Sequence, residues 1–263
     1  MKALDIIQQL ENKEPTDKAL TRREALNNGL SFGLKSALAM FPVGLMLKAN
    51  KSYAFVTTSA IDVLNFALTL EFLESTFYTM GLNASNLIPA SDLVVIQQIS
   101  KHESSHVVLL QGAITAAGGT PVSKPNFDFT AGGAYPDVFT NYATFLTLAN
   151  AFEDTGVRAY KGQAANLLGT DTLTVALDIH SVEARHASEI RRIRGQKGWI
   201  TGKSTAGVPD AVYAGTISED NVTQGGVDVT TITTSSPASV QEAFDEPLTM
   251  SEVLAIASAF IKQ

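Results

Sequence analysis

The feature that most constrains this chain is the motif Glu-x-x-His, which occurs twice at matching places of an internal repeat. It stands at Glu103–His106 and again, 80 residues later, at Glu183–His186. Side chains three residues apart lie on one face of an α-helix, so both residues of each motif can reach one point in space. The repeat also pairs Glu71 with Glu153, which lie 82 residues apart upstream of the two motifs. The pattern therefore predicts two related helical hairpins that share one interior.

Apolar residues at helical spacing place these acids and histidines on buried helix faces. The stripes that contain them include Leu64, Ala67, Ile99, Leu110, Leu146 and Ala149. A lone carboxylate is costly to bury unless it is paired or ligated. Four carboxylates in one seam repel one another unless cations lie between them. The pattern makes physical sense with two divalent metal ions and poor sense without them.

Capping and breaking residues divide the middle of the chain into four expected helices. We expect them at 59–80, from about 91 to 118, from Pro136 to about 169, and from about 170 to between 195 and 198. Ser59 followed by Asp62 is a capping signal, and Pro136 suits a first helical turn. The first and third links are short, whereas residues 118–135 are rich in Gly, Pro and Asn. This predicts an all-α, antiparallel four-helix bundle with one long crossover, the connectivity of ferritin-like folds.

One Glu from each of two helices and Glu-x-x-His from each of the other two resembles the ligand inventory of ferritin-like di-iron and di-manganese proteins. Within that superfamily the chain resembles the secreted ferritin-like proteins related to plant desiccation-associated proteins, and the stretch Ser239–Thr249 also looks like that subgroup. The resemblance implies a centre of two Fe or two Mn ions. Its implied ligands are Glu71, Glu103, His106, Glu153, Glu183 and His186. Glu103, with either Glu153 or Glu183, is expected to bridge the ions.

Other residues near the ligands have alternative interpretations. Glu74 lies one turn after Glu71 and competes with it, but the repeat pairs Glu74 with Gly156. We therefore favour Glu71 and expect Glu74 to be a solvated surface acid. Tyr78 and Tyr160 each follow a ligand glutamate by seven residues, a spacing similar to that in rubrerythrins. They either bind ligand carboxylates, carry electrons to the metal pair, or serve as ordinary core tyrosines.

The two remaining histidines, His102 and His180, do not correspond under the repeat. We predict surface or cap positions for both. Arg185 lies between two ligands in sequence and is expected to point outward.

Composition excludes several other kinds of site. The chain has no cysteine, which rules out disulfides, zinc–thiolate sites, iron–sulfur clusters and thiol catalysis. A metal must be held by His, Asp, Glu or neutral oxygens. With 26 acids, 19 bases and a formal charge of −7, the chain offers no basic stripe, so nucleic acid is not an expected partner.

The N-terminal extension, residues 1–54, has two interpretations. Arg22-Arg23, an apolar stretch from Leu30 to Leu47 and the segment Ser52–Ala54 resemble a twin-arginine export signal. This predicts a periplasmic or otherwise exported protein, with membrane or envelope association through the N-terminus. Alternatively, the segment is an amphipathic helix with solvated arginines, and the protein is cytoplasmic. The apolar run is too short and interrupted to predict a membrane span.

The C-terminal segment, residues 201–263, follows the bundle, which we assign to residues 55–200. It is rich in Thr, Ser, Gly, Val and Asp, and we expect a wrap over the bundle with a β-hairpin. Thr249–Glu252 is a capping box before an apolar run, which predicts a short fifth helix that packs on the bundle. No chemistry is expected in this region.

Three functions fit these residues. The first is a di-iron or di-manganese oxidase, peroxidase or catalase acting on O₂ or peroxide, since His and carboxylate ligands suit Fe and Mn. The second is ferroxidation, with Fe(II) as the substrate. The extensions at both ends disfavour a large ferritin-type cage, so a smaller homo-oligomer, a dimer, is expected. The third is a non-enzymatic stress-protection or envelope protein that keeps the metal site for structure.

Overall fold

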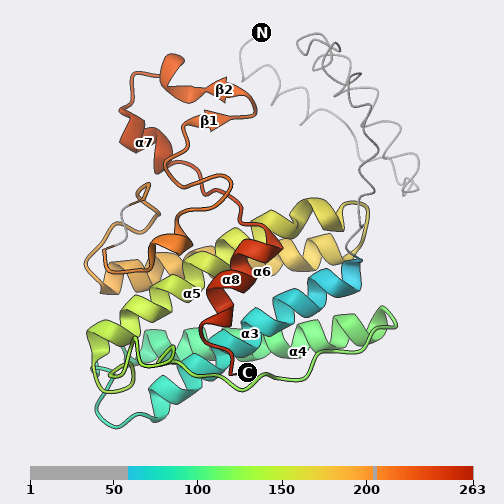
Figure 1. Cartoon of the computed structure of the whole chain (residues 1–263), viewed down its shortest axis with the longest axis vertical. Coiled ribbons are helices and arrows are strands. Elements are labelled where there is room, and N and C mark those ends of the chain that lie inside the picture. The colour runs from blue at the N-terminus through green and yellow to red at the C-terminus, as the bar shows by residue number, and fades with distance from the viewer. Residues whose placement is uncertain (1–58, 204–205, 263) are drawn as a thin grey trace, which may run out of the picture. The chain divides into compact units, whose positions relative to one another are not determined.

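The computed structural model describes residues 59–203 and 206–262 (Figure 1). The chain divides into two units, Met1–Phe55 and Val56–Gln263. The expected export signal in residues 1–54 lies outside the described residues, so its two interpretations stay predictions. No helix in the described part of the chain is both long and apolar enough to cross a membrane.

Four long helices form the centre of the second unit (Figure 1). They are α3 (Ala60–Asn83), α4 (Leu93–Ala116), α5 (Tyr142–Gln163) and α6 (Thr172–Ile193). A short link joins α3 to α4, and a second link, which contains the 3₁₀ helix η2 (Ala164–Leu167), joins α5 to α6. The long segment 117–141 carries the chain from the first hairpin to the second. This confirms the predicted all-α four-helix bundle with one long crossover.

The start of α3 follows the predicted capping box, but the helix does not end at residue 80 as predicted. The Ser59 hydroxyl accepts from the amide of Asp62 at 3.1 Å, and the Asp62 carboxylate accepts from the amide of Ser59 at 3.2 Å. The helix continues past Gly81 to Asn83. A Cβ at Gly81 would collide with the ring of Phe145, so this glycine permits close helix packing rather than ending the helix.

The predicted start of α5 at Pro136 is wrong by six residues. Residues before Asn141 form turns, in which the amides of Thr140 and Asn141 both bond to the carbonyl of Asp137. Asn141 then caps the helix, since its side-chain oxygen accepts from the amide of Ala143 at 3.0 Å. An asparagine cap competes effectively with a first-turn proline as a start signal.

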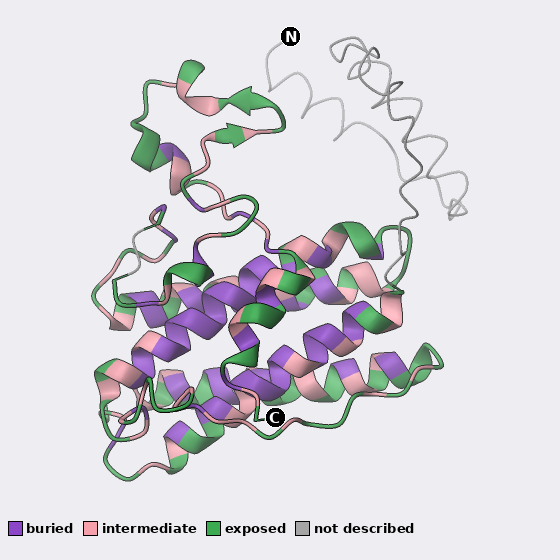
Figure 2. Cartoon of the chain, viewed as in Figure 1, coloured by how far each residue is buried: buried purple, intermediate pink, exposed green. Residues whose placement is uncertain are grey.

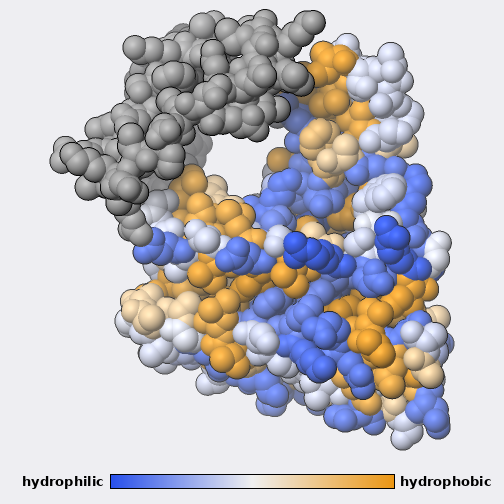
Figure 3. Space-filling model, turned by 180° about the vertical axis from the view of Figure 1, so that it is seen from behind, coloured by the Kyte–Doolittle hydropathy of each residue, from blue (hydrophilic) through white to orange (hydrophobic). Residues whose placement is uncertain are grey.

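Buried side chains line the inward faces of all four helices (Figure 2). One end of the interior is aromatic: the ring of Phe77 stacks on that of Phe145 with centroids 4.7 Å apart and meets Phe152 edge-on at 5.0 Å. Aliphatic residues such as Leu64, Leu68 and Leu110 pack at the other end. On the face shown in Figure 3, apolar and polar side chains are interspersed, which is ordinary for a water-exposed surface.

The C-terminal segment is mostly irregular and contains the predicted hairpin and short helix. Strands β1 (Thr223–Gln224) and β2 (Val227–Asp228) pair antiparallel. Short helices are η3 (Asp210–Val212), η4 (Val229–Thr231), α7 (Pro237–Gln241) and α8 (Met250–Ser258). The Thr249 capping box starts α8 as predicted, and Val253 and Ala257 bury the helix's apolar face.

The chain leading into α8 lies directly against α5. The amide of Leu248 donates to the carbonyl of Arg158 at 3.1 Å. A Cβ at Gly162, one turn further along α5, would collide with the backbone carbonyl of Leu248. Gly162 therefore allows a backbone-to-backbone approach that no other residue type would permit.

Candidate metal centre

The four long helices bring all six residues predicted as ligands into one buried cluster. α3 supplies Glu71, α4 supplies Glu103 and His106, α5 supplies Glu153, and α6 supplies Glu183 and His186. The four glutamates are 0% exposed, and His106 and His186 are 8% and 4% exposed. Helical spacing accounts for this result, since each Glu-x-x-His presents both side chains on the face that the apolar stripe buries.

The cluster contains two overlapping groups of candidate ligand atoms. In each group, four side chains offer atoms that all lie within 4.8 Å of one another. The first group is Glu71, Glu103, His106 and Glu183; the second is Glu103, Glu153, Glu183 and His186. Glu103 and Glu183 belong to both groups. The geometry therefore outlines two adjoining cation positions that share two carboxylates.

Both histidines turn Nδ1 toward the carboxylates. Nδ1 of His106 lies 3.2 Å from Oε2 of Glu71 and 3.1 Å from Oε1 of Glu183. Nδ1 of His186 lies 2.8 Å from Oε1 of Glu103 and 3.4 Å from Oε2 of Glu153. The same ring atom thus faces the cluster from both Glu-x-x-His motifs, as the repeat would require of two equivalent ligands.

Unpaired buried atoms show that a cation suits this cluster. Among the described residues, seven buried side-chain nitrogen or oxygen atoms have no hydrogen-bond partner. Five of the seven belong here: one oxygen each of Glu103 and Glu153, both oxygens of Glu183, and Nδ1 of His186. Each of the four oxygens lies within 4.0 Å of Nδ1 of His106 or His186, but without hydrogen-bond alignment. Unpaired buried polar atoms are costly, and these five converge as metal ligands do.

Burial and mutual repulsion shift the pKa values of the cluster. Burial, reinforced by Glu183, raises the pKa of Glu103 well above its ordinary value. Burial also raises the pKa of Glu153 to about 7, against the opposing charge of His186. Burial lowers the pKa of His106, but the nearby Glu103 and Glu183 outweigh it and raise the pKa to about 12. At neutral pH the cluster therefore holds protons that a bound cation would displace.

Tyr78 and Tyr160 bind the carboxylates of the opposite hairpin. The hydroxyl of Tyr78 on α3 donates to Oε1 of Glu153 on α5 at 2.5 Å. The hydroxyl of Tyr160 on α5 donates to Oε1 of Glu71 on α3. Burial and then the bonded carboxylate raise the pKa of both phenols, so both stay protonated donors. The sequence left three roles open for these tyrosines. In the structure, both tyrosines form the first of them, a hydrogen bond to the carboxylate of a candidate ligand.

Glu74 is not the solvated surface acid that the sequence predicted. It is 3% exposed, and burial, followed by repulsion from Glu183, raises its pKa well above the ordinary value. A Cβ at Gly156 would lie 3.2 Å from Oε1 of Glu74 and 3.4 Å from Oε2 of Glu183. The glycine that the repeat sets opposite Glu74 therefore leaves room for its carboxyl at the edge of the cluster.

His102 and His180 also differ from their predicted surface or cap positions. Both lie inside helices, His102 in α4 and His180 in α6, and both are half-buried. Nδ1 of His102 lies 2.8 Å from Nε2 of the candidate ligand His186. Nδ1 of His180 is buried without a hydrogen-bond partner. Arg185 is exposed, as predicted.

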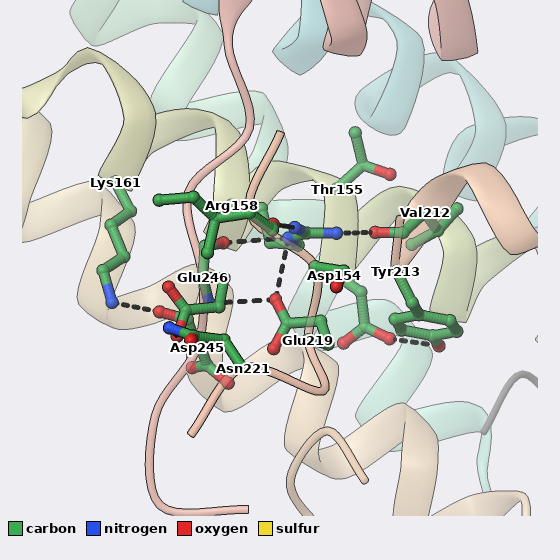
Figure 4. A network of polar contacts seen from close by, with 12 residues as sticks. Asp154, Thr155, Arg158, Lys161, Val212, Tyr213, Glu219, Asn221, Asp245 and Glu246 are labelled. Atoms are coloured by element: carbon green, nitrogen blue, oxygen red, sulfur yellow. Dashed lines mark hydrogen bonds and ion pairs between the residues drawn. The ribbon is translucent and has the colours of Figure 1, made fainter. Parts of the chain in front are cut away.

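A second buried charge cluster, which the sequence did not reveal, ties the C-terminal segment to α5 (Figure 4). Arg158 is 0% exposed. Its Nε lies 2.8 Å from Oε1 of Glu219 and donates to the carbonyl of Glu246 at 2.8 Å. Its other nitrogens donate to the carbonyls of Val212 and, at 2.9 Å, Ile217. The arginine is fully paired, so we assign it a structural role.

Asp154, the residue after Glu153, belongs to the same polar region on the far side of α5. Its carboxylate pairs with Arg191 of α6. It also accepts from the hydroxyl of Tyr213 at 2.7 Å (Figure 4). No sequence motif marks Arg158 or Asp154, because these partners lie far away in the sequence, 37 residues or more further along the chain.

The fold and the buried Glu and His cluster together define a ferritin-like protein with a site that can bind metal. The model of the ferritin-like domain family matches residues 59–196, or 138 of the 263 residues. The chain belongs to this family. The match spans all four long helices and the six candidate ligands, and it ends before the C-terminal segment. No curated protein matches the chain.

Proposed function

We propose that the buried cluster holds two divalent metal ions, iron or manganese, and that the protein carries out redox chemistry on O₂, peroxide or Fe(II). The observation that supports this most directly is the pair of four-residue groups that share Glu103 and Glu183. Histidine and carboxylate donors without thiolates suit Fe and Mn. A purely structural cluster would not leave five buried polar atoms unpaired.

The residues divide into shared and separate ligands. Glu71 and His106 would hold one ion, and Glu153 and His186 the other, because each pair occurs in one group only. Glu103 and Glu183 occur in both groups and would bridge, which favours Glu183 over Glu153 as the second bridging residue. When bound, two such ions supply the electrons that reduction of O₂ or peroxide requires.

The chain's own residues set the conditions for that chemistry. Tyr78 and Tyr160 orient the two separate carboxylates, Glu153 and Glu71, each from the opposite hairpin. Apolar packing above and below the cluster excludes water and strengthens every charge interaction inside it. The raised pKa values of Glu103 and Glu153 mean that protons leave these side chains as cations enter.

The test of the metal site is elemental analysis of the purified protein and of the double variant Glu103→Ala/Glu183→Ala. The wild type should carry two Fe or Mn ions per chain, and the variant should carry neither. Asp178→Ala/Glu189→Ala is the matched control, because it removes two exposed acids of α6 and should keep both ions. Unchanged metal content in the first variant would refute the assignment.

Two turnover assays separate the reactions. Rapid gas release from hydrogen peroxide by the metal-loaded protein would identify a manganese catalase activity. Oxidation of Fe(II) by O₂ without a second substrate would identify iron handling. A metal-loaded protein inert in both assays would refute both catalytic proposals. It would leave the alternative, an exported stress-protection or envelope protein related to desiccation-associated proteins, which the resemblance of Ser239–Thr249 favours.

A further inference from the structure

The two candidate ligand histidines differ in what lies behind their rings. Nε2 of His186, the nitrogen that points away from the carboxylates, lies 2.8 Å from Nδ1 of His102. The two rings are nearly parallel, with an interplanar angle of 14° and centroids 5.1 Å apart. Nε2 of His102 in turn lies 2.7 Å from the side-chain amide of Gln98. A chain of hydrogen bonds thus runs from the cluster, through two imidazoles, to an exposed glutamine.

The internal repeat shows that this chain of hydrogen bonds has no counterpart at the other candidate ligand histidine, His106. The offset of 80 residues that superposes His106 on His186 places Val182 at the position equivalent to His102. Valine has no group that can accept a hydrogen bond. The two hairpins are therefore alike in their six candidate ligands and unlike at this supporting position.

The positions of the protons along these hydrogen bonds depend on whether His186 binds a metal. A metal on Nδ1 of His186 requires that nitrogen to be unprotonated, so Nε2 carries the hydrogen and donates it to Nδ1 of His102. His102 then carries its own hydrogen on Nε2 and donates it to Gln98. Since an amide nitrogen cannot accept, the Gln98 amide must turn its oxygen toward His102; the two orientations of an amide are nearly indistinguishable in shape.

We infer that His102 is a positioning residue that fixes the tautomer and orientation of His186, and that it makes the two metal positions inequivalent. This inference rests on the proposed two-metal site. Ligand histidines in metalloproteins generally donate their second ring nitrogen to an acceptor that raises their basicity. In this protein His102 supplies that acceptor for His186, at the proposed metal position next to Glu153. Val182 offers no acceptor for His106, at the proposed metal position next to Glu71.

The first experiment is a calorimetric titration of the metal-free protein with Mn²⁺. His102→Leu removes the acceptor and should weaken one of the two binding steps by about 10-fold or more while leaving the other unchanged. His102→Asn places an amide oxygen where Nδ1 stood and should restore most of the lost affinity. Lys101→Leu, an exposed neighbour on α4, is the matched control and should bind as the wild type does. Equal affinities in His102→Leu and wild type would overturn the inference.

The second experiment reads the tautomers in the wild type and so does not depend on how the variants fold. Histidine-selective ¹⁵N labelling and long-range ¹H–¹⁵N spectra would be recorded with Zn²⁺, a diamagnetic probe. The loaded protein should show His102 protonated on Nε2 and His186 protonated on Nε2. A hydrogen on Nδ1 of His102 would overturn the inference. A wild type that takes up fewer than two ions would instead refute the two-metal proposal itself, a separate result.

Discussion

Helix α5 carries two buried charge clusters that differ in kind. On one side, Glu153 belongs to the cluster of four glutamates and two histidines, with Glu74 at its edge, in which five atoms lack hydrogen-bond partners. On the other side, Asp154 and Arg158 meet partners of opposite charge or backbone carbonyls. Glu153 and Asp154 are adjacent in sequence, and both are buried. They are separated only by the helical rotation that sends Glu153 into the bundle and Asp154 toward the C-terminal segment.

The difference teaches how to tell a structural cluster of charges from a binding site. Arg158 supplies the cation that Glu219 needs, so the charges of this cluster are balanced within the chain and we call it the complete cluster. Only one of its buried oxygens, Oε2 of Glu219, has no hydrogen-bond partner. The Glu153 cluster has an excess of acid and converging unpaired oxygens, so it is complete only with cations from outside. Burial alone does not separate the two cases; the balance of charge and the number of unpaired atoms, five against one, do.

The largest expected effect is on the complete cluster. Arg158→Met should lower the free energy of unfolding by about 3–5 kcal/mol, because Glu219 would remain buried without its partner. Urea unfolding followed by circular dichroism measures this. Lys161→Met is the matched control: Lys161 lies one turn away, donates to the carbonyl of Asp245, and should cost less than about 1 kcal/mol. A similar loss in both variants would contradict the assigned role of Arg158.

A smaller effect should appear in the incomplete cluster as a pH dependence. The pKa of Glu153 is about 7 in the folded protein against an ordinary value of 4.5, so the folded state favours the protonated form. Its contribution to stability is full below about pH 4.5 and is lost as the pH rises through 7. For one such group the loss between pH 5 and pH 7 is about 2 kcal/mol.

Bound metal should remove that loss, since a ligated carboxylate no longer needs its proton. The gap in unfolding free energy between metal-loaded and metal-free protein should therefore widen from pH 5 to pH 7, as measured by urea unfolding with and without a chelator. Burial also raises the pKa of Glu219 to about 7. This residue lies in the complete cluster, so its effect on the unfolding free energy is the same in the metal-loaded and the metal-free protein. A gap that narrows as the pH rises would contradict the metal assignment.

The smallest expected effect distinguishes Glu74 from Glu71. Glu74 belongs to neither four-residue group, and burial favours its protonated form. Glu74→Gln should therefore change the stability of the metal-free protein by about 1 kcal/mol or less and retain both ions. Glu71→Gln, the isosteric change one turn earlier, should lose one ion. Metal analysis of both variants decides between them, and loss of an ion in Glu74→Gln would make Glu74 a seventh ligand.

The sequence predicted the bundle and the placement of its six candidate ligands because both follow from helical periodicity and an internal repeat. The sequence did not predict the positions of Glu74 and His102, because both depend on contacts between helices. Glu74 is buried because Gly156 has no side chain, and the repeat showed the glycine without showing the space. His102 lies beside His186 because α4 and α6 approach there, which no local pattern records.

The second cluster was beyond prediction for a different reason. Arg158 contacts carbonyls 54, 59 and 88 residues further along the chain, all in the C-terminal segment. Helical periodicity identifies the face of a helix that is buried, but it does not identify which loop covers that face. An arginine at that position on α5 looks like any solvated base until the C-terminal segment is placed.

The close approach at Gly162 has a consequence for synthesis of the protein. A ribosome releases the four long helices before it has made Leu248, the residue whose backbone rests on Gly162. During that interval the nascent bundle already contains all six candidate ligands, while Arg158 still lacks its partners. Synthesis of the C-terminal segment therefore completes the burial of Arg158, and a chain that terminates early near residue 200 would contain all six candidate ligands but none of the groups that pair with Arg158.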